Sequence, residues 1–202
     1  MSIYESHMKL DTVYQLQCMN DIMREQIQTY DIASLAILGV AGGNGLEHVN
    51  LNKHHKIYGI DINTEYLNSC KSRYYDMRDK LTLLSRDLLD LAIDLPKAEL
   101  VIANLFLEYI GLDRFIFQLK KMSPEYVSVV IQVNDGEGFV SESPYHNAFD
   151  CLASVYHEIN SKALTDAMNE IDFALILDVE TELPNKKKLK RQDYKKQNKA
   201  DA

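Results

Sequence analysis

Apolar residues along the chain fall into two kinds of segment, and together they predict an α/β fold. Short apolar runs that suit buried strands occur at 35–38, 56–60, 81–84, 100–103 and 126–133. Segments with apolar residues three and four positions apart, typical of amphipathic helices, separate several of these runs. Such alternation predicts a largely parallel sheet flanked by helices.

The same periodicity, together with residues that favour helix ends, predicts the helices. They are expected at 12–29, 44–54, 64–79, 112–122, from about 144 to 159, and at 161–171. Thr12 and Gln15 are typical of a capping box at the start of the first helix. Ser143 followed by Pro144 indicates the start of the fifth helix, and Ser161 is expected to cap the sixth.

The last part of the chain predicts a different arrangement. Residues 174–183 and 187–196 have the character of two strands joined at Pro184 and Asn185. Two strands joined by so short a connection form an antiparallel hairpin. We therefore expect an antiparallel edge at the C-terminal side of the sheet.

Composition changes this picture mainly through charge. The chain is 46% hydrophobic and 26% charged, which is ordinary for a globular domain. The formal net charge is −8, yet residues 186–199 carry eight Lys or Arg and one acid, Asp193. An acidic body does not attract a phosphate backbone, and the basic end is more simply interpreted as a solvated strand or tail. We therefore expect no nucleic-acid partner.

The sequence also bears on membranes, secretion and metals. It contains no run of about 18 apolar residues, and its first residues lack the apolar centre of a secretion signal. Cys18, Cys70 and Cys151 are odd in number and far apart, so they predict neither a disulfide framework nor a metal site. We expect a cytoplasmic protein that holds no metal and no membrane anchor.

The main chemical signal is a glycine-rich turn after the first strand, Leu38-Gly-Val-Ala-Gly-Gly-Asn-Gly-Leu46. Glycine lets the backbone turn sharply and approach a ligand closely, and the N–H groups that open the next helix suit a nucleotide. The spacing fits neither G-x-G-x-x-G nor G-x-x-x-x-G-K followed by Ser or Thr. A pyrophosphate cradle and a nicotinamide-dependent oxidoreductase are therefore disfavoured.

Polar residues follow the next strands. Asp61 ends the second predicted strand, and Asp87 and Asn104 follow the third and fourth. Ligands of open α/β sheets bind at this carboxyl edge, where a carboxylate can accept two ribose hydroxyls. The structural alternatives are that Asp61 caps the helix near Thr64 and that Asp87 caps the short turn at 88–91.

With these segments in this order, the chain resembles the class I methyltransferases that use S-adenosyl-L-methionine (SAM). Gly39, Ala41 and Gly43 stand at the small-residue positions of that family's first motif. Ser85-Arg-Asp-Leu88 resembles its strand-three motif, and Ala103-Asn-Leu-Phe-Leu-Glu-Tyr109 resembles its segment after strand four. The resemblance covers roughly residues 34–183 and implies a SAM-dependent enzyme.

The resemblance implies a fold and a division into domains. The fold is a Rossmann-like three-layer αβα sandwich, whose seven-stranded sheet is mostly parallel with an antiparallel C-terminal strand. A helical cap is expected over 1–30, a methyltransferase domain over 31–197 and a tail over 198–202.

The resemblance also implies which residues hold SAM. Asp61 would hold the ribose hydroxyls, Asp87 would accept the adenine amino group, and the Leu88 N–H would face the adenine ring. The segment from Asn104 would lie under the methionine part. The implied cofactor-binding residues are Gly39, Val40, Ala41, Gly43, Asp61, Ile62, Asp87, Leu88, Asn104 and Leu105.

Two positions depart from the family pattern. Ile37 stands where the family usually has an acid that helps hold the SAM amino group, and Ala41 replaces the middle glycine. A non-catalytic module that binds SAM or a nucleoside is therefore a second hypothesis.

The segment after strand four also bears on the methyl acceptor. Asn104-Leu-Phe-Leu lacks the Pro-Pro and aromatic residue of enzymes that methylate nucleic-acid amino groups, and the sequence contains no Pro-Cys pair. The chain thus resembles the small-molecule branch, as a monomer or homodimer, and RNA methylation through the basic end is less favoured. The expected substrate-lining residues are Tyr4, Tyr14, Glu108, Tyr109, Asn134 and Tyr145, and the weak candidates for catalysis are His7, His146 and Tyr14.

The implied reaction is an in-line displacement. The acceptor attacks the sulfonium methyl group, and S-adenosylhomocysteine leaves. Because the sulfonium is already reactive, alignment and desolvation are expected to supply most of the rate. A general base is needed only where the acceptor holds a proton at neutral pH.

Overall fold

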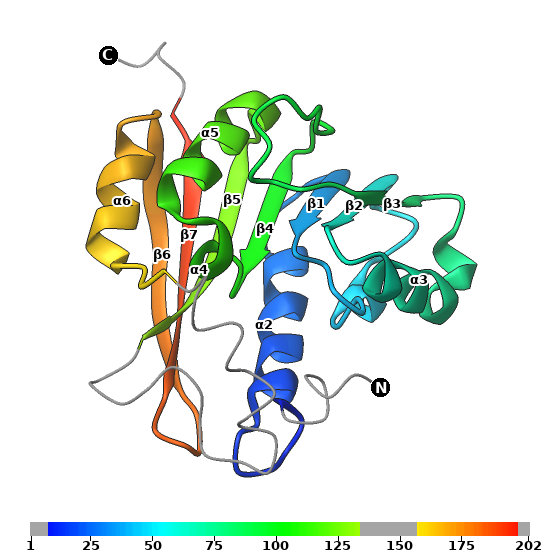
Figure 1. Cartoon of the computed structure of the whole chain (residues 1–202), viewed down its shortest axis with the longest axis horizontal. Coiled ribbons are helices and arrows are strands. Elements are labelled where there is room, and N and C mark those ends of the chain that lie inside the picture. The colour runs from blue at the N-terminus through cyan, green and yellow to red at the C-terminus, as the bar shows by residue number, and fades with distance from the viewer. Residues whose placement is uncertain (1–7, 134–156, 198–202) are drawn as a thin grey trace.

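The computed structural model describes residues 8–133 and 157–197. Within these residues, seven strands form one sheet in the order β3-β2-β1-β4-β5-β7-β6 (Figure 1). The strands are β1 (Ser34–Leu38), β2 (Lys56–Asp61), β3 (Leu81–Ser85), β4 (Leu100–Asn104), β5 (Tyr126–Val133), β6 (Phe173–Glu182) and β7 (Lys188–Lys196). β7 is antiparallel to both of its neighbours, and the other pairs are parallel. The predicted Rossmann-like sheet is confirmed.

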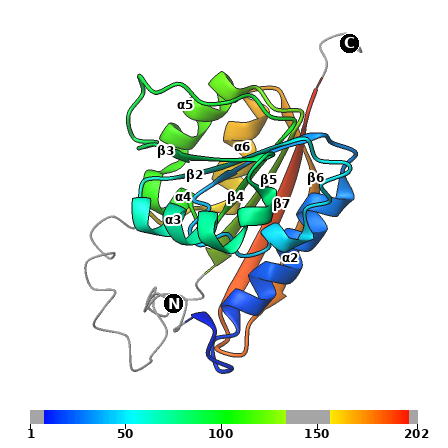
Figure 2. The ribbon, with the colours of Figure 1, turned by 90° about the vertical axis from the view of Figure 1, so that its right-hand side faces the viewer.

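Helices cover both faces of the sheet (Figures 1 and 2). They are α2 (Gln15–Thr29), α3 (Thr64–Arg73), α4 (Leu107–Ile110), α5 (Leu112–Met122) and α6 (Ser161–Asn169), with the 3₁₀ turns η1 (Leu46–His48) and η2 (Tyr75–Met77). One core cluster joins α4, α5 and α6 to one face, and a second joins α2 and α3 to the other. The three-layer arrangement is therefore present.

Burial on both faces explains why the strands are unbroken apolar runs. In β1, Ala36 and Leu38 belong to the cluster with α4, α5 and α6, whereas Leu35 and Ile37 belong to the cluster with α2 and α3. Alternate residues of a strand point to opposite faces. A strand between two helical layers is therefore apolar at most of its positions.

The helix predicted at 44–54 is wrong. Only η1 forms there, and turns lead from it to β2. Gly45 has a φ of +89°, and a Cβ at this position would overlap the side chain of Met23 in α2. Because α2 lies so close to this segment, the sheet face that the predicted helix would cover is partly filled by α2.

Several predicted helix ends also differ. α2 begins at Gln15 with Tyr14 as its N-cap and no capping side chain, so the Thr12 capping box is wrong. The side chain that caps α6 belongs to Asn160, which accepts hydrogen bonds from two N–H groups of the first turn, and Ser161 is the first helical residue. α3 stops at Arg73, where the prediction continued to 79. The helix expected after Ser143 lies outside the described residues.

The basic end of the chain forms β7, which lies between β5 and β6. Lys190 contacts Asp178 and Glu180 of β6, with N–O distances of 2.9 and 3.1 Å. Lys195 lies 4.0 Å from Glu125, and Arg191 is buried. These cations are therefore paired within the fold, and β7 is an interior strand rather than the solvated one that the sequence suggested.

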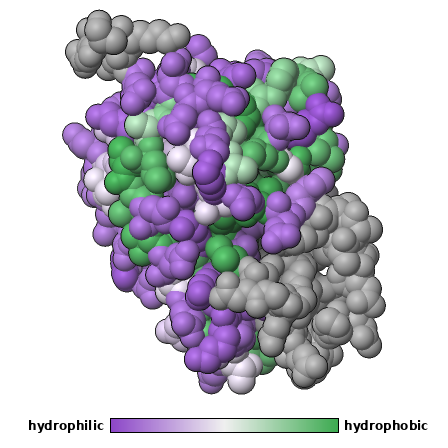
Figure 3. Space-filling model, turned by 90° about the vertical axis from the view of Figure 1, so that its left-hand side faces the viewer, coloured by the Kyte–Doolittle hydropathy of each residue, from purple (hydrophilic) through white to green (hydrophobic). Residues whose placement is uncertain are grey.

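The outer strand β6 shapes one side of the molecule. Leu175, Ile176 and Val179 are exposed on it, and charged residues such as Asp178 and Glu180 alternate with them. The face on the side of α6 and β6 accordingly carries apolar areas interrupted by hydrophilic ones (Figure 3). In the described ranges, no helix is long and apolar enough to cross a membrane.

Candidate functional site

The residues singled out in the sequence gather at the carboxyl edge of the parallel strands. The glycine turn follows β1, Asp61 ends β2, Asp87 follows β3 and Asn104 ends β4. The sheet continues through β2 and β3 on one side of β1 and through β4 and β5 on the other. The change of direction between β1 and β4 is the place where open α/β sheets bind their ligands.

The glycine turn is held by hydrogen bonds within the protein. Gly39 and Val40 both donate their N–H to the Ile60 carbonyl, at 2.8 and 3.1 Å, and Gly43 donates to Val40 at 2.9 Å. Ala41 donates to the Asp61 carboxylate at 2.9 Å. These N–H groups are occupied, and only the short η1 follows, so the turn does not lead into the helix N-terminus whose N–H groups the sequence suggested for a ligand.

Asp61 ties the turn to the end of β2. Its Oδ2 accepts from Ala41 N, and its Oδ1 accepts from Asn63 N at 2.8 Å. Asn63, not Asp61, caps α3, because the Asn63 side chain accepts from Glu65 N and Tyr66 N. Each carboxylate oxygen has a further lone pair, so half-buried Asp61 retains acceptor capacity for a ligand.

Two exposed side chains lie near Asp61 at the same edge. Ile62 is 65% exposed, which is unusual for a large apolar residue beside a buried strand. Asp87 is exposed and accepts from Leu89 N at 2.9 Å, so it does cap the turn that follows β3. The Leu88 side chain is buried in the core. An apolar side chain beside a carboxylate suits a ligand with a flat ring and hydroxyl groups.

Glu47 fixes the far side of the glycine turn. Its Oε2 accepts from Gly45 N at 3.0 Å and from the Tyr74 hydroxyl at 2.7 Å, and its Oε1 accepts from Asn20 Nδ2 at 2.6 Å. Burial works against ionisation, but hydrogen bonds from Tyr74 and Asn20 hold the pKa of Glu47 below its usual value. Glu47 therefore stays charged and joins the turn to α2 and to the end of α3.

Asn104 is held by α2 rather than standing free. It exchanges two hydrogen bonds with Gln26, with N–O distances of 2.8 and 2.9 Å. Gln26 is fully buried and also donates to the Ser128 hydroxyl at 2.8 Å. Sequence reasoning missed Gln26, although a glutamine beside the apolar stripe residues Met23 and Ile27 was a visible signal.

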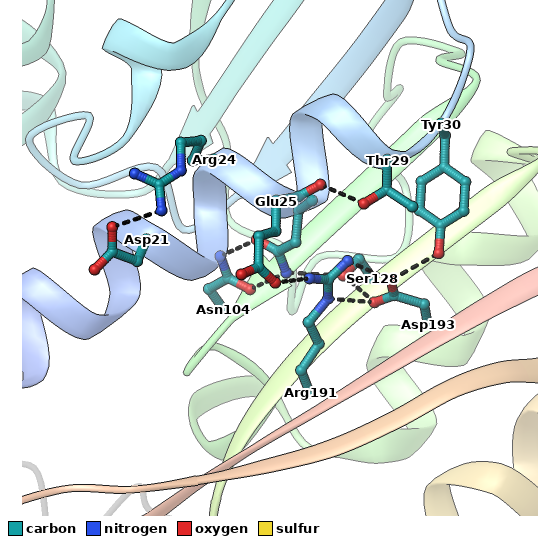
Figure 4. Close-up of polar contacts among 10 residues, drawn as sticks. Asp21, Arg24, Glu25, Thr29, Tyr30, Asn104, Ser128, Arg191 and Asp193 are labelled. Carbon is teal, nitrogen blue, oxygen red and sulfur yellow. Dashed lines mark hydrogen bonds and ion pairs between the residues drawn. The ribbon is translucent and has the colours of Figure 1, made fainter.

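From Gln26 and Ser128, a polar network continues to Asp193 and connects α2 with β5 and β7 (Figure 4). The Asp193 carboxylate accepts from Ser128, from the Tyr30 hydroxyl at 2.7 Å and from Arg191 Nη2 at 2.6 Å. Arg191 also reaches Glu25 of α2 at 3.1 Å. Burial and the hydrogen bond to Asp193 raise the pKa of Tyr30. The network fixes α2 against the sheet, and with it Gln26 and Asn104.

The segment after β4 packs against the glycine turn. Leu105 has a φ of +51° and donates its N–H to the Val130 carbonyl at 2.8 Å. The Phe106 ring lies so close to Gly39 that a Cβ at position 39 would overlap it. Non-glycine residues with positive φ gather at functional sites, and here Leu105 and Ala41, with a φ of +46°, lie on the two sides of the switch point.

Glu108 is a buried carboxyl at the same edge, with only 2% of its surface exposed. Its Oε1 accepts from Gln132 N at 2.9 Å, and no residue in the described part of the chain bonds to Oε2. Burial raises the pKa of Glu108 to about 7, against the opposing effect of the Gln132 N–H and its own N–H. Half-buried Tyr109 follows it on α4.

The remaining predicted substrate residues lie elsewhere. Tyr14 is 44% exposed and lines a cleft of about 410 Å³ between α2 and the β6–β7 hairpin, together with Ile22, Leu177 and Arg191. This cleft is on the α2 face, and Thr181, Glu182 and Leu183 at the carboxyl end of β6 also line it. Five of the predicted substrate or catalytic residues lie outside the described ranges: Tyr4, His7, Asn134, Tyr145 and His146.

Comparison with solved structures identifies the fold. The N-methyltransferase NodS from Bradyrhizobium japonicum WM9, in complex with S-adenosyl-L-homocysteine, is 10% identical, with 96% of each chain covered and a TM-score of 0.66. A geranyl diphosphate methyltransferase in complex with SAM is 8% identical, with 92% of this chain and 89% of that chain covered and a TM-score of 0.67. This chain has the fold of SAM-dependent methyltransferases.

The methyltransferase fold does not by itself decide the chemistry. The [4+2]-cyclase SpnF has a TM-score of 0.65 to this chain at 10% identity, with 89% of this chain and 80% of that chain covered. No family model and no curated protein sequence matches the chain. The function therefore has to be argued from the residues of the carboxyl edge.

Proposed function

We propose that this chain is a class I methyltransferase that transfers the methyl group of SAM to a small molecule. The observation that carries the proposal is the arrangement around Asp61. Its carboxylate ends β2 beside the switch point, holds the glycine turn through Ala41, and stands next to the exposed side chain of Ile62.

The residues at this edge fit the nucleoside part of SAM. The free lone pairs of Asp61 would accept the ribose hydroxyls, and Ile62 would cover one face of the adenine ring. Exposed Asp87, whose Oδ1 already accepts from Leu89 N, would accept the adenine amino group. Gly39 has a φ of +72°, a conformation that favours glycine, and it allows the Phe106 ring to pack against the turn.

The methionine part would lie over the end of β4. Ile37 is buried in β1 among the residues that face α2, so β1 supplies no carboxylate there. The polar groups at this end come from the segment after β4, where Gln26 holds Asn104 in one orientation. This arrangement departs from the usual family pattern and supports our proposal that residues 104–108 hold the methionine end.

When bound, SAM supplies an electrophilic methyl group on a sulfonium. The protein's own part is to align the acceptor with that methyl group and to exclude water. The ring of Phe106 and the buried chain around Glu108 provide an apolar surrounding for such a step. No described side chain has to form a covalent bond.

A small molecule fits the charges better than RNA does. Lys190, Arg191 and Lys195 contact Asp178, Glu25 and Glu125 respectively, so the basic strand meets acids of the same chain. A phosphate backbone is bound by Lys and Arg side chains that are not already paired with acids of the protein. We therefore propose a small-molecule acceptor for an enzyme that works without nucleic acid.

A thermal-shift experiment tests the cofactor part of the proposal. SAM and S-adenosylhomocysteine should raise the melting temperature, because a ligand that binds only the folded state adds about 2.7 kcal/mol of stability at 100 times its Kd. NAD at the same concentration should leave it unchanged. A rise with NAD and none with SAM would contradict the proposal.

A second experiment separates an enzyme from a binding module. SAM with an isotopic label in its methyl group is incubated with the protein and a small-molecule extract. An enzyme moves the label into a new small molecule and leaves S-adenosylhomocysteine. Binding of SAM without transfer of label to any fraction would favour the non-catalytic module.

A further inference from the structure

The Glu108 carboxyl lies where β4 would continue if the strand were longer. Asn104 is the last residue of β4 that pairs with β5, opposite Val130. Two residues further along β5, Gln132 N donates to Glu108 Oε1 at 2.9 Å. The carboxyl therefore stands beyond the end of β4, at the edge of the sheet where the switch point lies.

Glu108 is only partly satisfied there. Its side chain is almost completely buried, yet no residue of the described ranges bonds to Oε2. A buried polar atom without a hydrogen-bond partner destabilises the folded state. Proteins keep such atoms where a ligand, a proton or a functional constraint accounts for them.

Among the described residues, burial and backbone N–H groups determine the protonation of Glu108, and no neighbouring charge contributes. On its own helix the adjacent titratable residue is Tyr109, and β5 contributes neutral Gln132. The segment before α6 brings His157, whose N–H donates to the Glu108 carbonyl at 2.7 Å and whose ring lies beside Gly111. None of these side chains is among the causes of the shift, so within the described part of the chain the ionised carboxyl would have no cationic partner before SAM arrives.

We infer that Glu108 is the counter-ion of the SAM sulfonium, so that SAM favours the ionised carboxyl, whereas S-adenosylhomocysteine, which has no sulfonium, does not. This inference rests on the proposed function. Ile37 stands in β1 where the family usually has an acid. In this inference, Glu108 supplies the methionine end with a carboxylate from α4 instead. It also gives the site a means to distinguish cationic SAM from its neutral thioether product.

The difference follows from electrostatics. An opposite charge within about 4–6 Å lowers the pKa of a carboxyl by about 1–3 units. The free protein has a Glu108 pKa of about 7, so SAM should bind more tightly as the pH rises toward 7 and then level off. S-adenosylhomocysteine shares the amino acid and nucleoside of SAM but has no sulfonium, and serves as the internal control.

Calorimetric titration with SAM and with S-adenosylhomocysteine, at pH 5.5 and pH 8, tests the inference. SAM affinity should rise about tenfold or more between these pH values, whereas S-adenosylhomocysteine affinity should change far less. In Glu108→Gln, which keeps an oxygen for Gln132 N, the SAM ratio should fall to that of S-adenosylhomocysteine. Glu170→Gln removes an equal charge from an exposed site and should preserve the SAM ratio.

The outcomes separate this inference from the proposed function. Equal pH dependence for the two ligands overturns the inference alone, and so does a SAM pH dependence that persists in Glu108→Gln. Absence of binding by both ligands at both pH values overturns the proposed function and the inference with it. A melting curve of Glu108→Gln without ligand confirms that the variant is folded.

Discussion

At the scale of single residues, burial of the Glu108 carboxyl links folding to pH. Its pKa is raised by burial to about 7, from an ordinary value of 4.5. The folded protein therefore binds this proton more tightly than the unfolded chain does. The resulting stabilisation is complete below pH 4.5 and is lost as the pH rises through 7.

Glu108→Gln removes this linkage and should change the pH profile of stability. Relative to the wild type, the variant should gain about 2–3 kcal/mol in unfolding free energy between pH 5 and pH 8, because one pKa unit corresponds to about 1.4 kcal/mol. Urea unfolding at the two pH values measures the change. Parallel profiles for the two proteins would show that Glu108 does not titrate in this range.

The backbone conformation of Ala41 also predicts a measurable effect on stability. Its φ of +46° lies in the left-handed region, which costs a residue with a Cβ about 1–2 kcal/mol. Ala41→Gly removes that strain. Glycine also increases the conformational entropy of the unfolded chain, which lowers the stability by about 0.4–1 kcal/mol. We expect a net stabilisation of up to about 1 kcal/mol by denaturant unfolding.

Ala36→Gly is the matched control for this substitution. Ala36 is fully buried in β1 and its φ is not positive. Glycine within a strand is destabilising by about 0.5–1 kcal/mol, so the two alanines should respond with opposite signs. Equal destabilisation by both substitutions would argue against strain at Ala41.

At the scale of elements, the attachment of α2 depends on charges buried beneath it. Arg191 is 5% exposed and Asp193 is fully buried, and Tyr30 and Glu25 connect the pair to α2. Removal of one partner of a buried pair leaves the other charge uncompensated. This network, more than helix propensity, should determine whether α2 stays docked.

Arg191→Met tests this dependence. It should lower the unfolding free energy by about 3–5 kcal/mol, because the Asp193 carboxylate keeps only hydroxyl partners. Lys190→Met is the control one residue away, where the pairs with Asp178 and Glu180 are more exposed and are expected to be worth about 1 kcal/mol or less. Similar losses in both variants would contradict a special role for the buried pair.

The elements show what the sequence could and could not predict. β5 at Tyr126–Val133 and α5 at Leu112–Met122 match their predictions, because an apolar run or a 3.6-residue stripe is a local signal. The prediction of a helix at 44–54 was wrong because the packing of Met23 against Gly45 is a tertiary contact, which a local sequence pattern does not reveal. No local pattern could reveal that Tyr30 bonds to Asp193, which is 163 positions away.

In the candidate site, too, local features were predictable from the sequence and contacts between distant segments were not. Asp61 was predictable, since the end of a parallel strand can be located from the apolar run before it. Its bond to Ala41 was not, and neither was the exchange of hydrogen bonds between Asn104 and Gln26. Glu108 was expected to line a substrate site, and only the three-dimensional packing shows that its carboxyl is buried.

At the scale of the whole molecule, the charge distribution argues against nucleic acid. The formal net charge is −8, and the cations of β7 at Lys190, Arg191 and Lys195 meet acids of the chain. Fluorescence anisotropy with short single-stranded and duplex RNA should therefore show no saturable binding at about 0.15 M salt. Saturable binding that weakens with added salt would revive the RNA methyltransferase hypothesis.

The central claim is that SAM binds at the carboxyl edge through Asp61. Calorimetric titration of the wild type, Asp61→Asn and Asp76→Asn with SAM tests it most directly. Asp76 is exposed in η2, before the start of β3 and away from the carboxyl edge. Asp61→Asn should bind SAM at least about tenfold more weakly, because hydrogen bonds to a charged group are worth about 1.5–3 kcal/mol. Asp76→Asn should bind like the wild type. Failure of the folded wild type to bind SAM, or equal affinity in all three proteins, would contradict the account.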